Sequence, residues 1–309
     1  MCGIAGIIHR QGSAHIGTEV TSMLQSMKHR GPDSTGFALY GPPSDLVVMR
    51  FTLADPRTVT DYGYVERLER SRSEVESRLA KIGANVERMN GETSYAYRAL
   101  IRYEGELKAL ADYVEDVPGV EILSLGSSLE IVKDLGDAEN VAEQYDLSTF
   151  EGTHAIGHVR MATESDVDIS GAHPYWAYPF SDVAVVHNGQ LTNYHHWRRR
   201  LERSGHRFQS ECDSEIIAVY LAERMGEGLS LEVAMKTSLE EFDGVFTYLV
   251  VTKDSLGMAK DSMAAKPLVL FESADVVAMA SEEGAIHAVL PDAVETFDPY
   301  EGEVLVWSL

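Results

Sequence analysis

The chain has 309 residues, of which 44% are hydrophobic and 24% are charged, enough apolar material for the core of one large domain or two ordinary ones. Its 49 acidic and 26 basic side chains give a formal charge of −23, which repels nucleic-acid backbones and anionic membranes. No apolar run approaches the roughly 20 residues of a membrane span, and the N-terminus lacks the layout of a secretion signal. We therefore expect a cytoplasmic protein with neither nucleic acid nor a membrane among its partners.

The hydrophobic pattern predicts a layered α+β protein with many antiparallel strands and helices outside them. The turn Gly41-Pro42-Pro43 suits a hairpin between the second and third strands. Region 53–149 is more charged and looks self-contained, so we expect an inserted α/β subdomain, used for packing or docking, within a domain spanning 1–309. The predicted strands are 4–9, 36–40, 46–49, 95–103, 120–125, 129–135, 155–159, 183–187, 245–252, 267–271, 276–280 and 303–307, and the predicted helices are 20–27, 65–82, 106–114, 138–145, 193–204, 214–224 and 231–241.

Cys2 carries the first chemical signal. Its side chain is small, so we expect Met1 to be removed, which leaves a thiol and a free α-amine on one residue. An α-amine with a pKa of about 7.7–8 is a competent base at neutral pH and can generate the thiolate nucleophile. The alternative is that Cys2 merely begins a buried first strand. The second cysteine, Cys212, cannot form a disulfide framework with it, and we expect both to be reduced and Cys212 to be a small buried side chain.

Arg160 and Thr163 follow a predicted strand. An arginine at a strand end can bind a carboxylate through two parallel hydrogen bonds, and Thr163 adds a hydroxyl nearby. The alternative for Arg160 is an ordinary surface ion pair. We expect His158, within the strand, to be a satisfied structural residue rather than a base.

Asn188-Gly189 ends another apolar run. Asn-Gly is typical of a hairpin turn. Its functional alternative is an oxyanion hole, in which the side-chain amide of Asn188 and the backbone N–H of Gly189 donate to one developing negative charge.

Asp213 stands at the start of a predicted helix. Asp213 or Ser214 is a good helix N-cap, and this interpretation is compatible with any function. A carboxylate there can also bind an ammonium group. Together, Arg160 and Asp213 fit the two charged ends of an α-amino acid.

These segments, taken in order, resemble the class II glutamine amidotransferases of the N-terminal nucleophile hydrolase superfamily. The resemblance covers nearly the whole chain outside the insertion. It rests on Cys2-Gly3-Ile4, on 29–37 (HRGPDSTGF), on 157–163 (GHVRMAT), on His187-Asn188-Gly189, on Asp213-Ser214-Glu215, and on Lys260-Asp261 and Lys266-Pro267-Leu268.

The resemblance implies a four-layer αββα sandwich and hydrolysis of the glutamine side-chain amide. It makes Cys2 the nucleophile and its α-amine the general base, with Asn188 and Gly189 as the oxyanion hole. Arg160 would bind the α-carboxylate of glutamine, with Thr163 nearby, and Asp213 would bind its α-ammonium. Arg30 would support the Cys2 end of the site. The segment 160–171 would close over bound glutamine, with Gly171 as a hinge.

The resemblance also implies a use for the ammonia. We expect separate synthase subunits, in a hetero-oligomer, to receive it, because no acceptor domain follows the amidotransferase segments. Among free-standing relatives, 30–40 and the insertion resemble the amidotransferase subunit of N-methylglutamate synthase and of similar glutamate-synthase-like complexes. This implies no cofactor and no metal in this chain, and FMN and an iron–sulfur cluster in partner subunits.

Two alternatives remain open. The chain could be a self-sufficient amide hydrolase of the same superfamily that acts on another γ-glutamyl or amide substrate. It could also be a non-catalytic assembly subunit of a synthase complex, although the candidate nucleophile, substrate-binding and oxyanion residues are all present.

Overall fold

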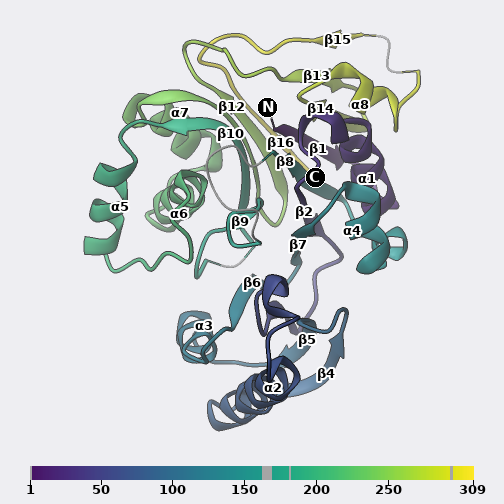
Figure 1. The fold of residues 1–309 in the computed structure, drawn as a ribbon. Helices are drawn as coiled ribbons and strands as arrows, with labels where there is room; N and C mark the ends of the chain where they lie inside the picture. The colour runs from purple at the N-terminus through teal and green to yellow at the C-terminus, as the bar shows by residue number, and fades with distance from the viewer. Residues whose placement is uncertain (1, 162–168, 181, 293–294) are drawn as a thin grey trace.

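Two antiparallel sheets packed face to face, with helices outside both, form the body of the protein in a computed structural model that describes residues 2–161, 169–180, 182–292 and 295–309 (Figure 1). This is the expected four-layer αββα sandwich. Each sheet has one face against the other sheet and one against helices, so its strands read as nearly continuous apolar runs. In the described part of the chain, every helix is too short or too polar to span a bilayer.

The larger sheet holds the N-terminal strand at its centre. β1 (Gly3–His9) lies between β14 (Val276–Ala280) and β8 (His154–Arg160), antiparallel to both. Three helices, α1 (Ile16–Ser26), α4 (Ala138–Gln144) and α8 (Glu283–His287), pack on or beside this sheet. The sheet order is β15 (Thr296–Phe297), β13 (Val269–Glu272), β14, β1, β8, β2 (Ser34–Tyr40) and β7 (Leu129–Leu135).

The second sheet carries the Asn-Gly segment. Its order is β16 (Val304–Ser308), β12 (Ser255–Lys260), β11 (Gly244–Val251), β10 (Ala184–Leu191) and β9 (Tyr175–Trp176). Its outer face is covered by α6 (Asp213–Gly226) and α7 (Leu231–Glu241), with α5 (Tyr194–Arg203) packed beside α6.

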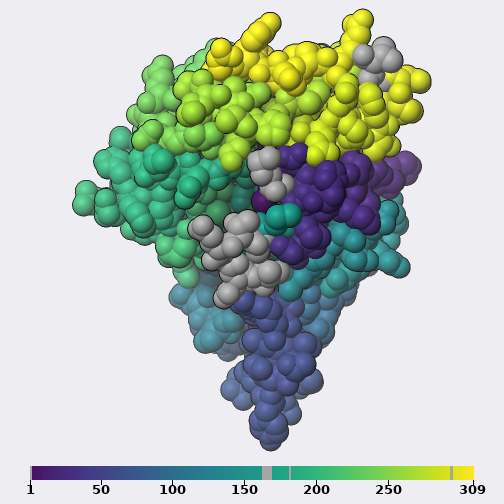
Figure 2. All heavy atoms as spheres, turned by 45° about the horizontal axis from the view of Figure 1, so that its top comes forward, coloured from purple at the N-terminus to yellow at the C-terminus, as the bar shows by residue number. Residues whose placement is uncertain are grey.

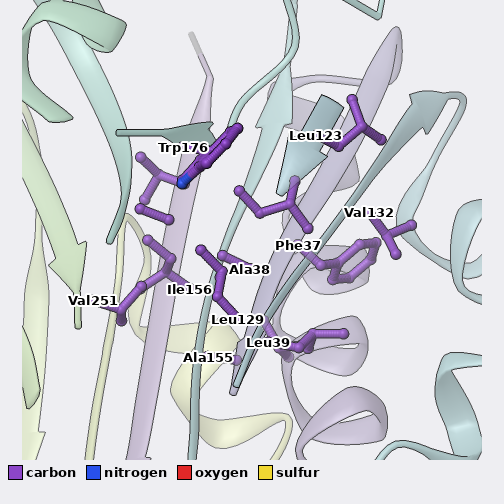
Figure 3. Close-up of a cluster of buried hydrophobic side chains, with 14 of the residues drawn as sticks. Phe37, Ala38, Leu39, Leu123, Leu129, Val132, Ala155, Ile156, Trp176 and Val251 are labelled. Atoms are coloured by element: carbon purple, nitrogen blue, oxygen red, sulfur yellow. The ribbon is translucent and has the colours of Figure 1, made fainter. Parts of the chain in front are cut away.

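Apolar side chains fill the space between the layers. Gly6 in β1 faces Leu249 in β11 so closely that a β-carbon on Gly6 would lie 3.1 Å from the Leu249 Cδ1 atom. Figure 3 shows the neighbouring part of this core, where Ile156 of β8, Trp176 of β9 and Val251 of β11 lie on one side of the large sheet and Phe37 and Leu39 of β2 on the other. The two sheets are therefore in direct contact. Because the interior is close-packed, a small displacement of one sheet displaces side chains of the other.

A third, four-stranded sheet projects from the body (Figures 1 and 2). Its strand order is β4 (Asn85–Gly91), β5 (Ala96–Arg102), β3 (Val47–Thr52) and β6 (Glu121–Gly126), and it is accompanied by α2 (Tyr64–Lys81) and α3 (Leu107–Glu115). The three remaining helical segments are single 3-10 turns, η1 (Lys28–Arg30), η2 (Pro56–Thr58) and η3 (Leu147–Thr149).

The range of this small sheet differs from the predicted 53–149. β3 begins at Val47, before the predicted start, whereas β7 pairs with β2 in the large sheet and α4 packs on α1. Apolar runs as short as β7 do not reveal which sheet they join, because partners are set by long-range contacts.

One other expectation about strands is wrong, and some strands were missed. β2 pairs with β7 and β8, whereas β3 pairs with β5 and β6, so the turn at Gly41 passes from one sheet to another instead of forming a hairpin. β4, β9, β12 and β15 were not predicted, and β9 and β15 are two residues long. β4 is exposed over most of its length, and β12 contains a glycine, so both lack the apolar alternation that marks a strand.

Glu115 joins the small subdomain to the body. Its side chain is only 5% exposed, and it accepts a hydrogen bond from the Ile122 backbone N–H at 2.9 Å and another from the Gln209 side-chain amide. Burial raises the pKa of the Glu115 carboxyl to about 7, because the charged form loses its hydration.

We predict that this junction weakens as the pH rises. The folded state holds the Glu115 proton more tightly than the unfolded state does, so the stabilisation is complete below the unfolded pKa of 4.5 and is lost as the pH passes about 7. Between pH 5 and pH 8 the free energy of unfolding should therefore fall more in the wild type than in Glu115→Gln, as measured by urea denaturation. Glu104→Gln, an exposed position of the same subdomain, is the control. Parallel pH profiles for wild type and Glu115→Gln would contradict the prediction.

Candidate active site

Cys2 lies directly before β1, at the centre of the large sheet. Its Sγ atom is 3.4 Å from the Met161 backbone nitrogen, which follows the end of β8, and both cysteines of the chain are free thiols. The Cys2 carbonyl oxygen accepts hydrogen bonds from the Arg30 Nε and Asn188 Nδ2 groups, each at 3.2 Å. Pairing of β1 and two side-chain donors thus fix Cys2, which as a residue stays partly exposed.

Arg30 is itself held by Glu282, a residue that the sequence analysis missed. The Arg30 Nη1 group is 2.5 Å from the Glu282 Oε1 atom, and the exposed His29 ring is 3.1 Å from the same oxygen. Partial burial acts to raise the pKa of the Glu282 carboxyl, but hydrogen bonds from Arg30 and His29 outweigh it and lower that pKa. A charge-assisted bond of this kind keeps the guanidinium against the Cys2 carbonyl.

Asn188 and Gly189 lie within β10, which runs on to Leu191, so the alternative of an Asn-Gly hairpin turn is wrong. Besides the Cys2 carbonyl, the Asn188 Nδ2 group reaches the Ser281 Oγ atom at 3.4 Å. Gly189 has φ +137, and a β-carbon there would lie 2.1 Å from the Val245 carbonyl oxygen. Only glycine fits this position.

Ser281 is a second residue that the sequence analysis missed. Its hydroxyl oxygen accepts the Ile4 N–H at 3.0 Å, and its own N–H donates to the Ile4 carbonyl at 2.9 Å. Ser281 therefore ties Asn188 to the first strand. Ser281 and Glu282 follow a plain apolar strand, and nothing in their local sequence marks them, because their role depends on pairing β14 with β1.

Asp213 is the first residue of α6, and the N-cap is Cys212, which makes no side-chain capping bond. The prediction that Asp213 or Ser214 is the N-cap is therefore wrong. The Asp213 Oδ2 atom accepts the Leu191 N–H at 2.7 Å, which ties the carboxylate to the end of β10. Across the described ranges no lysine or arginine forms an ion pair with Asp213, whose side chain is 18% exposed. The one basic side chain near it in these ranges is His187, whose Nδ1 atom lies 3.7 Å from the Asp213 Oδ1 atom.

Arg160 ends β8 and is almost fully buried, with its carbonyl accepting the Asp33 N–H at 3.1 Å. Gly31 packs directly on it, since a β-carbon there would lie 2.5 Å from the Arg160 carbonyl carbon. Thr163, and most of the segment 160–171 that was expected to close over a substrate, lie outside the described residues.

A layer of buried histidines lies next to these residues. The rings of His158 and His173 stack at 4.1 Å, and His187 lies 6.4 Å beyond His173. Burial lowers the pKa of all three, that of His158 to about 3, so all are neutral. We expected His158 to be a structural residue with all its hydrogen bonds made. Its Nδ1 atom, however, has no hydrogen-bond partner in the described part of the chain. No described group of three or more histidine, cysteine, aspartate or glutamate side chains is arranged to hold a metal ion.

The structure thus brings most of the predicted residues to one place. Cys2, Arg30 and Asn188 are joined by hydrogen bonds, Gly189 follows Asn188, and Arg160 precedes the residue that contacts the thiol. Asp213 joins through the end of the same strand that carries Asn188. The arrangement combines a nucleophile, hydrogen-bond donors beside it and a carboxylate able to bind a cation.

Comparisons with known proteins identify the family of the chain. Residues 158–288 match the family model of a glutamine amidotransferase domain. The chain is 37% identical to a protein of Methanothermobacter thermautotrophicus named as a glutamine amidotransferase, with 100% of both chains covered. It is 34% identical to the glutamine amidotransferase-like protein GlxB of Rhizobium meliloti, with 100% of this chain and 98% of that protein covered.

A solved structure supports the fold alone. Glutamine phosphoribosylpyrophosphate amidotransferase from B. subtilis superposes with a TM-score of 0.62 at 20% identity, over 99% of this chain and 47% of that one. This chain therefore spans about half the length of that enzyme. From its full-length relatives and its fold, the chain belongs to the class II glutamine amidotransferase family.

Proposed function

We propose that this chain hydrolyses the side-chain amide of glutamine through Cys2 and supplies the ammonia to a separate synthase subunit. The contact that carries the proposal is the 3.2 Å hydrogen bond from the Asn188 amide to the Cys2 carbonyl, because it places an oxyanion donor on the nucleophilic residue itself. Arg160 would bind the α-carboxylate of glutamine and Asp213 its α-ammonium. Thr163 would lend a hydroxyl nearby, and Arg30 would hold the Cys2 backbone.

The proposed chemistry begins after Met1 has been removed. The α-amine of Cys2 takes the thiol proton, and the thiolate attacks the amide carbon. The oxyanion that forms accepts hydrogen bonds from the Asn188 amide and the Gly189 N–H. The carbon–nitrogen bond then breaks, and the protonated amine gives its proton to the departing ammonia. A water molecule, deprotonated by the same amine, attacks the thioester and releases glutamate and the thiol.

Asn188 has to exchange one contact in this scheme. Its Nδ2 atom carries two hydrogens, which point to the Cys2 carbonyl and to the Ser281 hydroxyl. The hydrogen bond to Ser281 is the longer one, at 3.4 Å, so it is the weaker of the two and less free energy is lost when it breaks. The oxyanion would take that hydrogen, while the bond to the Cys2 carbonyl keeps the amide in place.

We predict that Cys2→Ala lowers glutamine hydrolysis by at least about a thousand-fold, because no other group would form the thioester. Glutamate release measures the rate. A second variant, with Lys inserted between Met1 and Cys2, keeps the thiol but blocks removal of Met1, and it should be similarly inactive because Cys2 then lacks its α-amine. Mass spectrometry reports the N-terminus of each protein. Hydrolysis that survives Cys2→Ala would sink the mechanism.

Asn188→Ala is expected to lower kcat about 100- to 1,000-fold while changing KM little, because an oxyanion donor acts mainly in the transition state. Steady-state kinetics with glutamine provide the test. Gln190→Ala is the matched control, since Gln190 is an exposed side chain on the same strand. A loss that appears in KM instead, or equally in both variants, would show that Asn188 is not an oxyanion donor.

The synthase partner would be one that binds FMN and an iron–sulfur cluster, as in N-methylglutamate synthase, in a hetero-oligomer with this chain. The described residues are accounted for by the four layers and the small sheet, so the acceptor chemistry would lie elsewhere. The small subdomain offers a docking surface. Three apolar side chains near the start of α2 are exposed, Val59, Tyr62 and Val65, and Tyr62 is completely so. Such a patch on a projecting element is typical of a contact site.

We expect the double substitution Tyr62→Ser with Val65→Ser to abolish copurification of the flavin-containing subunit from native cells, without lowering the glutaminase rate of the isolated chain. Flavin absorbance and mass spectrometry identify the partner. Val233→Ser is the control, because Val233 is an exposed apolar residue of the body. If the double variant copurifies with the flavin-containing subunit as well as the wild type does, the docking surface is not at the start of α2. An isolated chain that hydrolyses glutamine as fast as the complex would favour a self-sufficient hydrolase.

A further inference from the structure

Ser214, in the first turn of α6, lies among several groups of the candidate site and has no assigned role. Ser214 is 1% exposed. Its hydroxyl oxygen lies 2.8 Å from the His187 Nδ1 atom and 3.2 Å from the His173 Nε2 atom. It also lies 3.4 Å from the Asp213 Oδ1 atom. The Cys212 Sγ atom is a fourth neighbour, at 3.5 Å, but a thiol is only a weak donor and acceptor. A hydroxyl can accept two hydrogen bonds and donate one, so the two rings and the carboxylate use its full capacity.

The hydrogen-bond network fixes the direction of each bond. The backbone N–H of His187 can only donate, and it points at the His173 Nδ1 atom at 3.2 Å, so that nitrogen is the acceptor. His173 is neutral because burial lowers its pKa, and its proton is then on Nε2, from where it donates to the Ser214 oxygen.

His187 completes the assignment. Its Nε2 atom is buried without a partner in the described part of the chain. A proton there would be an orphaned donor, which costs more than an unused acceptor, so the proton of neutral His187 belongs on Nδ1 and donates to the Ser214 oxygen. With both accepting positions filled, the Ser214 O–H is left for the Asp213 Oδ1 atom.

The Asp213 carboxylate is thereby held at both oxygens. The Leu191 N–H donates to Oδ2 at 2.7 Å, and the Ser214 hydroxyl donates to Oδ1. Donors on two different oxygens fix the orientation of the carboxylate. The same hydroxyl also holds His187, which directly precedes Asn188, and His173, which follows the segment proposed to close over glutamine.

We infer that Ser214 is a positioning residue that orients Asp213 toward the α-ammonium group of the substrate and links that carboxylate to the oxyanion strand. The inference rests on the proposed glutaminase function. Because an ammonium-binding carboxylate acts on bound substrate and transition state alike, its misorientation weakens binding more than it slows the chemical step.

The test compares glutamine with glutaramate, which has the same amide and carboxylate but no α-amino group. Ser214→Ala should raise KM for glutamine about ten-fold or more, as expected for a lost hydrogen bond to a charged group, with kcat within about two-fold of wild type. For glutaramate its kcat/KM should equal that of the wild type, because this substrate has no ammonium for Asp213 to bind. Ser214→Thr retains the hydroxyl and should restore most of the affinity for glutamine.

Ser238→Ala is the matched control. Ser238 is a fully buried helical serine with two hydrogen bonds, to the Met235 carbonyl and the Tyr248 hydroxyl, far from the site in the chain and on another helix. Ser238→Ala should lower the thermal stability of the protein about as much as Ser214→Ala does, but it should leave the KM for glutamine unchanged. Equal losses on glutamine and glutaramate in Ser214→Ala would overturn the inference and leave a purely structural role. A wild type without Cys2-dependent glutamine hydrolysis would instead refute the proposed function.

Discussion

The site depends on the position of β1 between two antiparallel neighbours. Pairing with β8 sets Gly3 opposite Val159, which places Cys2 beside Met161, and pairing with β14 brings Ser281 and Glu282 to the same end of the sheet. A slip of β1 by one residue would exchange its two buried faces, so that side chains fitted to the second sheet would face the helices instead. The register of β1 therefore fixes a chain end that would otherwise be mobile, and preorganises the nucleophile before any substrate arrives.

The second sheet supplies the remaining groups by direct contact with the first. Asn188 reaches across from β10 to the Cys2 carbonyl, and this is feasible because Gly6 lets Leu249 approach closely a short distance away. Gly189 similarly allows β10 to lie against β11. Gly6 thus helps to set the separation of the two sheets, and Gly189 keeps the oxyanion strand paired with its neighbour in the second sheet.

Much of the fold could be predicted from the sequence, since long apolar runs and helical periodicity locate most strands and helices. The order of the short motifs singled out Cys2, Asn188, Gly189 and Asp213 as candidates, and their roles stay predictions. Their local patterns were less informative, since Asn188 and Gly189 lie within a strand and Asp213 is not the N-cap. The hairpin at Gly41 and the boundaries of the small subdomain failed for one physical reason: strand partners are chosen by contacts between distant segments. Ser281 and Glu282 were missed for the same reason, because they come close to Cys2 and Arg30 only when β14 pairs with β1.

The buried histidines form a polar layer between two largely apolar sheets, and their neutral state makes this layer tolerable there. A protonated ring there would lack water, and burial holds the pKa of His158, His173 and His187 low, so the layer carries no charge. Neutral rings can both donate and accept, which lets one serine hydroxyl join them in a directed chain that ends on a carboxylate. Apolar replacements would pack as well but would leave the Asp213 carboxylate with one fixed oxygen. The polar layer therefore trades some stability for the orientation of a charge at the site.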